Sequence, residues 1–297
     1  MSIPPQSVAS TVHAPEAILA HPRFADARTA FVDAVLALHE GDAFHNRLLV
    51  EAVRQVTFNL LVILHLRHDK SDPTTWPTMR RLKEELSIFS LASPRRIDAL
   101  VARLIHLGYL ESRPTPHDRR MRILTPTAKM MSLDREWLAY HYVPLQVMFP
   151  DSYAEPLRRD PAFQREQRLA ALDFSARGAQ IMASNPAVMR FMNRDAGVLV
   201  LIKLVQMSTA ADRAEGLSYT DIGTRFGVSR THVRTVLEEA AQHGDVSLSG
   251  RGGRLVALQP SILQAFDRFL ADAMSGHDLL YKFARERMAK EVRRPNF

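Results

Sequence analysis

The chain contains the same succession of local patterns twice, and this duplication limits the folds open to it more than any other feature. A short amphipathic segment, a turn, a second amphipathic segment and a glycine before a strand occur at 82–86, 92–97 and 107–110, and again at 222–226, 228–233 and 243–246. The offset is 140 residues in the first segment (222 − 82) and 136 in the second (229 − 93), so the first turn has four extra residues. This order predicts two modules, each with two short helices and a hairpin.

The duplication extends over nearly the whole chain from about residue 21. Further matching pairs are 21–24 with 160–163, 60–64 with 200–204, and 124–126 with 258–260. The last offset is 134 (260 − 126), which predicts a second hairpin about two residues shorter than the first. Proline-rich sequence marks the junction of the halves. We therefore predict a flexible N-terminal tail over 1–20, a first unit over 21–145, a linker over 146–160 and a second unit over 161–297.

Each unit is expected to be mainly α-helical, with one small β-hairpin as a wing. Apolar residues at helical spacing predict helices over about 24–40 and 45–67, and again over about 162–183 and 187–208. The two short helices and the hairpin come next in each half. A helix is then expected to open at Pro126 or Pro260, because proline suits the first helical turn. The predicted fold class is mainly α, with two tandem winged helix-turn-helix domains.

Composition indicates the kind of partner and excludes several kinds of site. The formal charge of +7 suits a polyanion such as nucleic acid. The chain has no cysteine, which excludes disulfides, thiolate zinc sites and iron–sulfur clusters. No run of about 18 apolar residues predicts a membrane span, and the first residues lack the pattern of a secretion signal. We expect a cytoplasmic, nucleoid-associated protein.

The second short helix of each half is expected to have an apolar stripe and a polar face. The inward residues are Ile97, Leu100, Val101 and Leu104 in one helix, and Val233, Val236, Leu237 and Ala240 in the other. The outward residues are then Arg95, Arg96, Asp98, Ala99 and Arg103, and Arg230, Thr231, Arg234 and Thr235. Such a helix enters the major groove of DNA with its N-terminal part, where Arg can bond guanine and Thr can contact a base edge or a thymine methyl. For Asp98 two alternatives stay open: it accepts from a cytosine amine, or it orients Arg95.

Two predicted strands after Gly108 flank a basic tip, Asp118-Arg119-Arg120. This stretch resembles the MarR family of bacterial transcription regulators. In that family a Leu-rich helix ends in glycine and is followed by a strand, a tip with Asp-Arg-Arg, a second strand and a Leu-Thr helix start. The residues that match are Arg103, Leu104, Gly108, Leu110, Arg113, Asp118, Arg119, Arg120 and Leu124. The close match covers about 78–129, and the two preceding helices agree more loosely.

The resemblance implies a sequence-specific transcription regulator that binds double-stranded DNA, and we expect a repressor that occludes a promoter. It makes Arg120 the candidate minor-groove residue, with Asp118 orienting it. A narrow minor groove concentrates negative potential and so attracts arginine. Arg119 and Arg122 are expected to meet phosphates, and Arg113 to meet the minor groove or a phosphate.

The second hairpin departs from the family's pattern. Its turn is Gly-Arg-Gly-Gly over 250–253 and has no Asp-Arg-Arg, although Arg251 and Arg254 can still contact the DNA backbone. The family works as a dimer of chains about as long as one unit. The resemblance therefore implies an intrachain pseudo-dimer joined by its outer helices, whose half-sites would lie about 10 base pairs apart. A homodimer of the whole chain, with four modules, is an alternative.

No arrangement of residues predicts catalysis, a cofactor or a metal site. His65 and His68 have a spacing that can hold zinc, but a polar helix end explains the pair better. The aromatic run of Trp137, Tyr140, His141, Tyr142 and Phe149 has two interpretations. The family often binds small aromatic or lipophilic acids, so the run can line a pocket for a small-molecule effector. Helix packing needs aromatic residues as well, and we favour packing.

Two other functional classes stay open. A plasmid-type replication initiator also places two winged helices on one chain, and tandem repeats beside a replication origin as the bound DNA would favour it. The third hypothesis is a winged-helix assembly module that binds only protein. It predicts that Arg95→Ala plus Arg230→Ala leaves activity intact.

Overall fold

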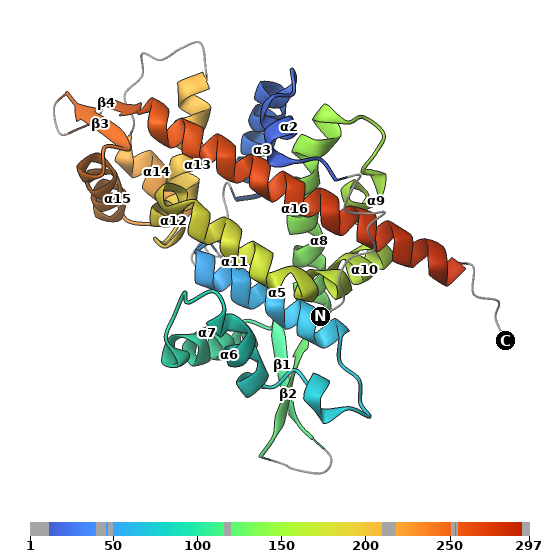
Figure 1. The fold of residues 1–297 in the computed structure, drawn as a ribbon. Coiled ribbons are helices and arrows are strands. Elements are labelled where there is room, and N and C mark those ends of the chain that lie inside the picture. The colour runs from blue at the N-terminus through green and yellow to red at the C-terminus, as the bar shows by residue number, and fades with distance from the viewer. Residues whose placement is uncertain are drawn as a thin grey trace. The chain divides into compact units, whose positions relative to one another are not determined.

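The computed structural model describes residues 12–39, 46, 50–115, 120–209, 218–250, 253 and 255–292. It is 72% helical, and two antiparallel hairpins of two strands each form the sheets of this described part (Figure 1). The predicted class, mainly helical with small hairpins, is confirmed. No helix in the described ranges is long and apolar enough to cross a membrane.

The chain divides into two compact units, and each is built from segments that are far apart in the sequence. Unit 1 includes Val53–Gln180 and Ser275–Phe297, whereas unit 2 comprises Ala14–Ala52 and Ile181–Met274. This division differs from the sequential one expected from the repeat. An amphipathic pattern shows that a helix has a buried face, but it does not show which neighbour covers that face.

Unit 1 contains the first of the two hairpins and has a core of buried apolar side chains from several helices. Its elements are α5 (Ala52–Leu66), the 3-10 turn η1 (Pro73–Thr75), α6 (Met79–Ser87), α7 (Pro94–His106), β1 (Leu110–Pro114), β2 (Arg122–Pro126), α8 (Ala128–Met148), α9 (Ala154–Leu157), α10 (Pro161–Ala171), the 3-10 turn η2 (Leu172–Phe174) and the end of α16 (Pro260–Val292). Leu110 lies opposite Pro126 in the hairpin. The rings of Phe58 in α5 and Trp137 in α8 are 4.6 Å apart.

Unit 2 combines helices from the start of the chain with the second module. Its elements are α2 (Pro15–Leu19), α3 (Phe24–His39), α12 (Pro186–Met192), α13 (Gly197–Thr209), α14 (Tyr219–Phe226), α15 (Arg230–Gln242), β3 (Val246–Ser249), β4 (Leu255–Leu258) and the first part of α16; α11 (Ser175–Ser184) has residues in both units. α3 packs on α13, where Gln206 Nε2 donates to Asp33 Oδ1 at 2.9 Å. Arg28 of α3 also pairs with Asp267 of α16 at 2.7 Å. Helix α3, the first helix predicted from the sequence, therefore packs with helices of the second half of the chain.

The two modules are built on matching helix ends. The hydroxyls of Thr78 and Ser218 cap α6 and α14, each accepting from a backbone N–H in the first turn, at 3.3 Å and 3.2 Å. Gly108 and Gly244 follow α7 and α15 with φ of 72° and 74°, in the left-handed region that glycine adopts without strain. The duplication found in the sequence is thus a duplication of local structure.

Three proline positions test the predicted boundaries. Pro126 is the last residue of β2 and does not open a helix; α8 begins at Ala128, after Thr127 as its N-cap. Pro260 is the first residue of α16, as predicted. Pro144 lies buried inside α8, which continues to Met148 and so runs into the predicted linker. Packing along the whole helix outweighs the single backbone hydrogen bond that Pro144 cannot make.

Two long predicted helices are interrupted. The stretch 162–183 is split into α10 and α11 by η2, and 187–208 is split into α12 and α13. Ala196, just before α13, has φ of 51°. The second hairpin is four residues shorter than the first and not two, because its paired ends are 12 residues apart (258 − 246) against 16 (126 − 110). The expected difference of two residues was wrong because Pro126 and Pro260 are not equivalent: Pro126 ends a strand, whereas Pro260 begins a helix.

A stacked pair of histidines in unit 1 leads to an expected pH dependence. The rings of His141 and His277 lie 4.3 Å apart, and burial lowers the pKa of His277 to about 3, with nearby Arg168 contributing. Burial also lowers the pKa of His141, with His277 and Arg168 as further causes. The unfolded chain binds these protons near the ordinary pKa of 6.5, whereas the folded chain does not. Protonation of the two histidines in the unfolded chain therefore costs the folded state no stability above pH 6.5. Below that pH the free energy of unfolding decreases as the pH falls toward 3.

Tryptophan fluorescence can follow this loss, because both tryptophans of the chain, Trp76 and Trp137, lie in unit 1. We expect the urea midpoint of unit 1 to fall as the pH is lowered from about 7 to about 4. The variant with His141→Leu and His277→Leu should show a flatter decline, whereas His243→Ala, at an exposed position in unit 2, should follow the unchanged protein. An equally steep decline in the double variant would contradict the assignment.

Candidate nucleic-acid interface

Helix α7 turns its apolar stripe inward and a basic face outward. Three of the four predicted inward residues, Ile97, Val101 and Leu104, are at most 4% exposed, and the fourth, Leu100, is half-buried. The predicted outward residues are all exposed: Arg95, Arg96, Asp98, Ala99 and Arg103. The helix therefore presents its arginines from the first turn onward.

Two guanidinium groups on this face are available to a partner. Among the described residues, no side chain or backbone group bonds the guanidinium groups of Arg95 and Arg103. Asp98 forms its ion pair with Lys83 of α6, with Nζ and Oδ1 2.6 Å apart. The alternative in which Asp98 orients Arg95 is therefore not what the structure shows. The ion pair instead connects α7 to α6.

The first hairpin carries arginines on both strands. Arg113 pairs with Glu111 at 2.6 Å. Arg122 donates from Nε to the hydroxyl of Ser112 at 2.8 Å, and from Nη2 to the Ser112 carbonyl. Arg120 is exposed. Two predicted tip residues lie outside the described residues: Asp118 and Arg119. The strand arginines are thus held along the hairpin and still reach solvent.

The start of α8 holds the end of α7 and the hairpin together. The Thr127 backbone N–H donates to the Tyr109 carbonyl at 2.9 Å, and its hydroxyl donates to the Gly108 carbonyl at 2.8 Å. Lys129 Nζ donates to the Leu107 carbonyl at 3.3 Å and lies 4.1 Å from the centre of the Tyr109 ring. Sequence reasoning missed this role of Lys129. The available signal in the sequence was the positive charge of Lys129, because a cation is favoured at the C-terminal, negative end of a helix such as α7.

Helix α15 repeats the burial pattern of α7. Its predicted inward residues are all buried: Val233, Val236, Leu237 and Ala240. Its predicted outward residues are all exposed: Arg230, Thr231, Arg234 and Thr235. Ser229 caps the helix, its hydroxyl accepting from the His232 N–H at 3.0 Å. The predicted faces of both helices are therefore confirmed.

The outward face of α15 is partly occupied by its own side chains. Arg234 Nε bonds Glu238 Oε1 at 2.7 Å, and this hydrogen bond raises the pKa of Arg234. The hydroxyl of Thr235 donates to the Thr231 carbonyl at 3.0 Å. Arg230 has no side-chain partner among the described residues. The second helix thus offers fewer open donors than the first.

The second hairpin pairs Val246 with Leu258 and Ser249 with Leu255. Its turn is fastened to α14, because the Tyr219 hydroxyl donates to the Gly253 carbonyl. Two predicted contact residues lie outside the described part of the chain: Arg251 and Arg254. The strands themselves carry no lysine or arginine.

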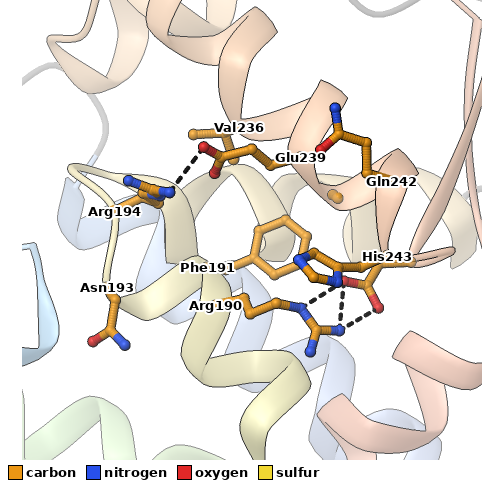
Figure 2. Close-up of a pocket in the computed structure, with 10 residues that line it drawn as sticks. Arg190, Phe191, Asn193, Arg194, Val236, Glu239, Gln242 and His243 are labelled. Atoms are coloured by element: carbon orange, nitrogen blue, oxygen red, sulfur yellow. Dashed lines mark hydrogen bonds and ion pairs between the residues drawn. The ribbon is translucent and has the colours of Figure 1, made fainter.

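A pocket of about 480 Å³ lies in unit 2 beside the inner side of α15 (Figure 2). Arg190 and Asp245 form an ion pair there with three hydrogen bonds: Nη2 lies 2.8 Å from each carboxylate oxygen, and Nε lies 3.2 Å from one of them. Arg194 pairs with Glu239 at 2.8 Å, and Phe191 contributes an apolar wall. In these pairs two arginines meet two carboxylates. The first joins α12 to the turn between α15 and β3, and the second joins the residues just after α12 to α15. Sequence reasoning missed them because the partners are 55 and 45 residues apart.

The aromatic run after the first hairpin is used for packing, as we favoured. Tyr142 is fully buried, its hydroxyl donates to the His277 carbonyl at 3.0 Å, and its ring lies 5.7 Å from Phe163. His65 lies in the last turn of α5 and His68 lies just after the helix, and burial lowers the pKa of each. In the described residues, no group of three or more His, Asp or Glu could hold a metal ion.

Comparison of the chain with models of known families, with curated proteins and with solved structures finds no match. The function of the chain is therefore inferred from its own residues and their geometry.

Proposed function

We propose that the chain is a sequence-specific, double-stranded-DNA-binding transcription regulator of the MarR type, and that it acts as a repressor. In this proposal α6–α7–β1–β2 and α14–α15–β3–β4 are two winged helix-turn-helix modules. Helices α7 and α15 enter the major groove at two half-sites, and the first hairpin reaches the minor groove with Arg120. The two modules of one chain take the place of a dimer.

The observation that carries this proposal is the match between α7 and α15, each of which has a buried apolar face and an exposed face with arginines. Each turns its predicted apolar stripe inward, with Leu100 of α7 half-buried and the other stripe residues buried. Each also presents arginines from its first turn, where a recognition helix meets base edges. In the first module the open guanidinium groups of Arg95 and Arg103 and the arginine-bearing hairpin lie on one connected framework, fastened by Thr127 and Lys129. A rigid framework is what base recognition requires, because hydrogen bonds to base edges depend on position.

Selection of bound duplexes from a random pool is the decisive experiment. A transcription regulator of this kind selects a motif with two half-sites about one helical turn apart. Tandem repeats found beside a replication origin would favour an initiator. No enrichment of any sequence, together with capture of a protein partner, would favour the assembly module. The protein-to-DNA ratio at the selected site then distinguishes one chain from a homodimer with four modules.

Affinity for the selected duplex should depend steeply on salt. Each phosphate neutralised by a lysine or arginine contributes about −0.9 to the slope of log K against log salt, so about six contacts give a slope near −5. Binding titrations between about 50 and 200 mM potassium chloride measure this slope. A flat response would contradict an interface made largely of arginine.

A further inference from the structure

The two proposed recognition helices differ in net charge. Helix α7 carries three arginines and one acidic residue, Asp98, whose carboxylate is already held by Lys83. Helix α15 carries two arginines and two acidic residues, Glu238 and Glu239. A polyanion approaching α7 therefore meets a net positive face, whereas one approaching α15 meets a helix that carries no net charge.

The structure shows how the charge of α15 is balanced on its outward side. Glu238 follows Arg234 by one helical turn, so both side chains project from the same face, and their charged atoms lie 2.7 Å apart. Both side chains are largely in solvent, with 66% and 47% of their surface exposed. A phosphate or base that approaches Arg234 therefore also meets the Glu238 carboxylate. Glu239 differs, because it turns toward Arg194 at the pocket (Figure 2).

The hairpins reinforce the difference. Arg113 and Arg122 lie on the strands of the first hairpin, while the strands of the second carry only Val, Ser, Leu and Ala. On α15 the Thr235 hydroxyl already donates to its own helix and can only accept from DNA. Arg230 is then the one cation of the α15 face that has no intrachain partner among the described residues.

We propose that the two modules contribute unequally to DNA binding, and that Glu238 sets the inequality by neutralising Arg234. The partner is then a duplex with one strongly specified half-site, bound by α7 and the first hairpin, and one loosely specified half-site, bound by α15 mainly through Arg230. This inference rests on the proposed function. It adds that the DNA site is asymmetric and names the residue that holds the second module at low affinity.

The test compares Glu238→Gln with a matched control, Glu136→Gln. Both variants remove one exposed carboxylate that pairs with an arginine. Glu136, on α8, pairs with Arg159, and neither residue belongs to a proposed recognition helix or to a hairpin. We expect Glu238→Gln to tighten binding about fivefold at low salt, because a like charge next to the DNA is removed and Arg234 is released. The salt slope should steepen by about 0.9, for one added phosphate contact. Glu136→Gln should change neither quantity.

Selection from a random duplex pool gives the second measurement. The unchanged protein should select a motif with one well-defined half and one degenerate half, and Glu238→Gln should sharpen only the degenerate half. Two equally defined halves, or equal binding by Glu238→Gln and the unchanged protein, would overturn the inference and leave the proposed function standing. Failure of the unchanged protein to bind any duplex would instead refute the proposed function.

Discussion

Replacement of Asp134 by alanine is expected to destabilise unit 1 by about 3–5 kcal/mol, because it leaves a buried arginine without its counter-charge. Asp134 is fully buried, and Arg168 is 8% exposed. Their two-bond pair has distances of 2.6 and 3.1 Å, and Gln164 donates a further bond to Asp134 at 2.7 Å. The pair joins α10 to α8. The sequence predicted an amphipathic helix over 162–183, but not that this charge would lie inside.

Urea unfolding followed by tryptophan fluorescence measures the effect, since both tryptophans lie in unit 1. Asp173→Ala is the matched control, because Asp173 pairs with Arg67 at the surface and such pairs contribute at most about 1 kcal/mol. The double replacement Asp134→Leu and Arg168→Met removes both charges together and should recover most of the lost stability. A loss below about 1 kcal/mol for Asp134→Ala would show that Arg168 does not depend on this partner.

The double replacement Arg95→Ala and Arg230→Ala is expected to weaken specific DNA binding by at least about 30-fold, because paired arginine–guanine contacts contribute about 1–3 kcal/mol each. Both residues lie in the first turn of a proposed recognition helix, and neither has a side-chain partner among the described residues. Their removal leaves no buried charge behind, so the fold should be unaffected. Fluorescence anisotropy with the selected duplex measures the affinity, and circular dichroism checks the helices.

The matched control replaces two exposed arginines that belong to neither module, Arg23 and Arg159. It removes the same charge, and each arginine pairs with a solvent-exposed acid, Asp26 or Glu136. We expect a loss of at most about threefold, from the reduced overall field alone. Equal losses in the two double variants would indicate binding through net charge only. Unchanged binding of the Arg95 and Arg230 variant would remove both residues from the interface.

Local patterns predicted the two modules well. The apolar stripes of α7 and α15, the glycines at their ends and the exposure of every described outward residue agree with the helical spacing of the sequence. These features depend on residues within a few turns of one another, so periodicity is sufficient to find them. The DNA contacts proposed for these residues stay a prediction until binding is measured.

Boundaries were predicted less well where packing decided them. Pro144 stays within α8, and the stretch 162–183 breaks at η2, although local pattern favoured the opposite in each case. A proline or a break costs a few kcal/mol at most, and burial of a long apolar face can exceed that cost. The roles of Lys129 and Glu238 were missed because each depends on where a neighbouring carbonyl or guanidinium lies in space.

Spacing and composition along the chain are sufficient to predict the duplicated order of helices and hairpins, the faces of α7 and α15 and the positive charge. The three-dimensional fold was needed to show that α3 packs with α13 and that α10 packs with α8 through Asp134 and Arg168. It was also needed to show that Arg234 pairs with Glu238, whereas Arg95 has no partner among the described residues. An amphipathic pattern indicates only that one face of a helix is covered by a neighbour and that a buried charge has a partner. Which neighbour or partner this is depends on where the chain places it in space.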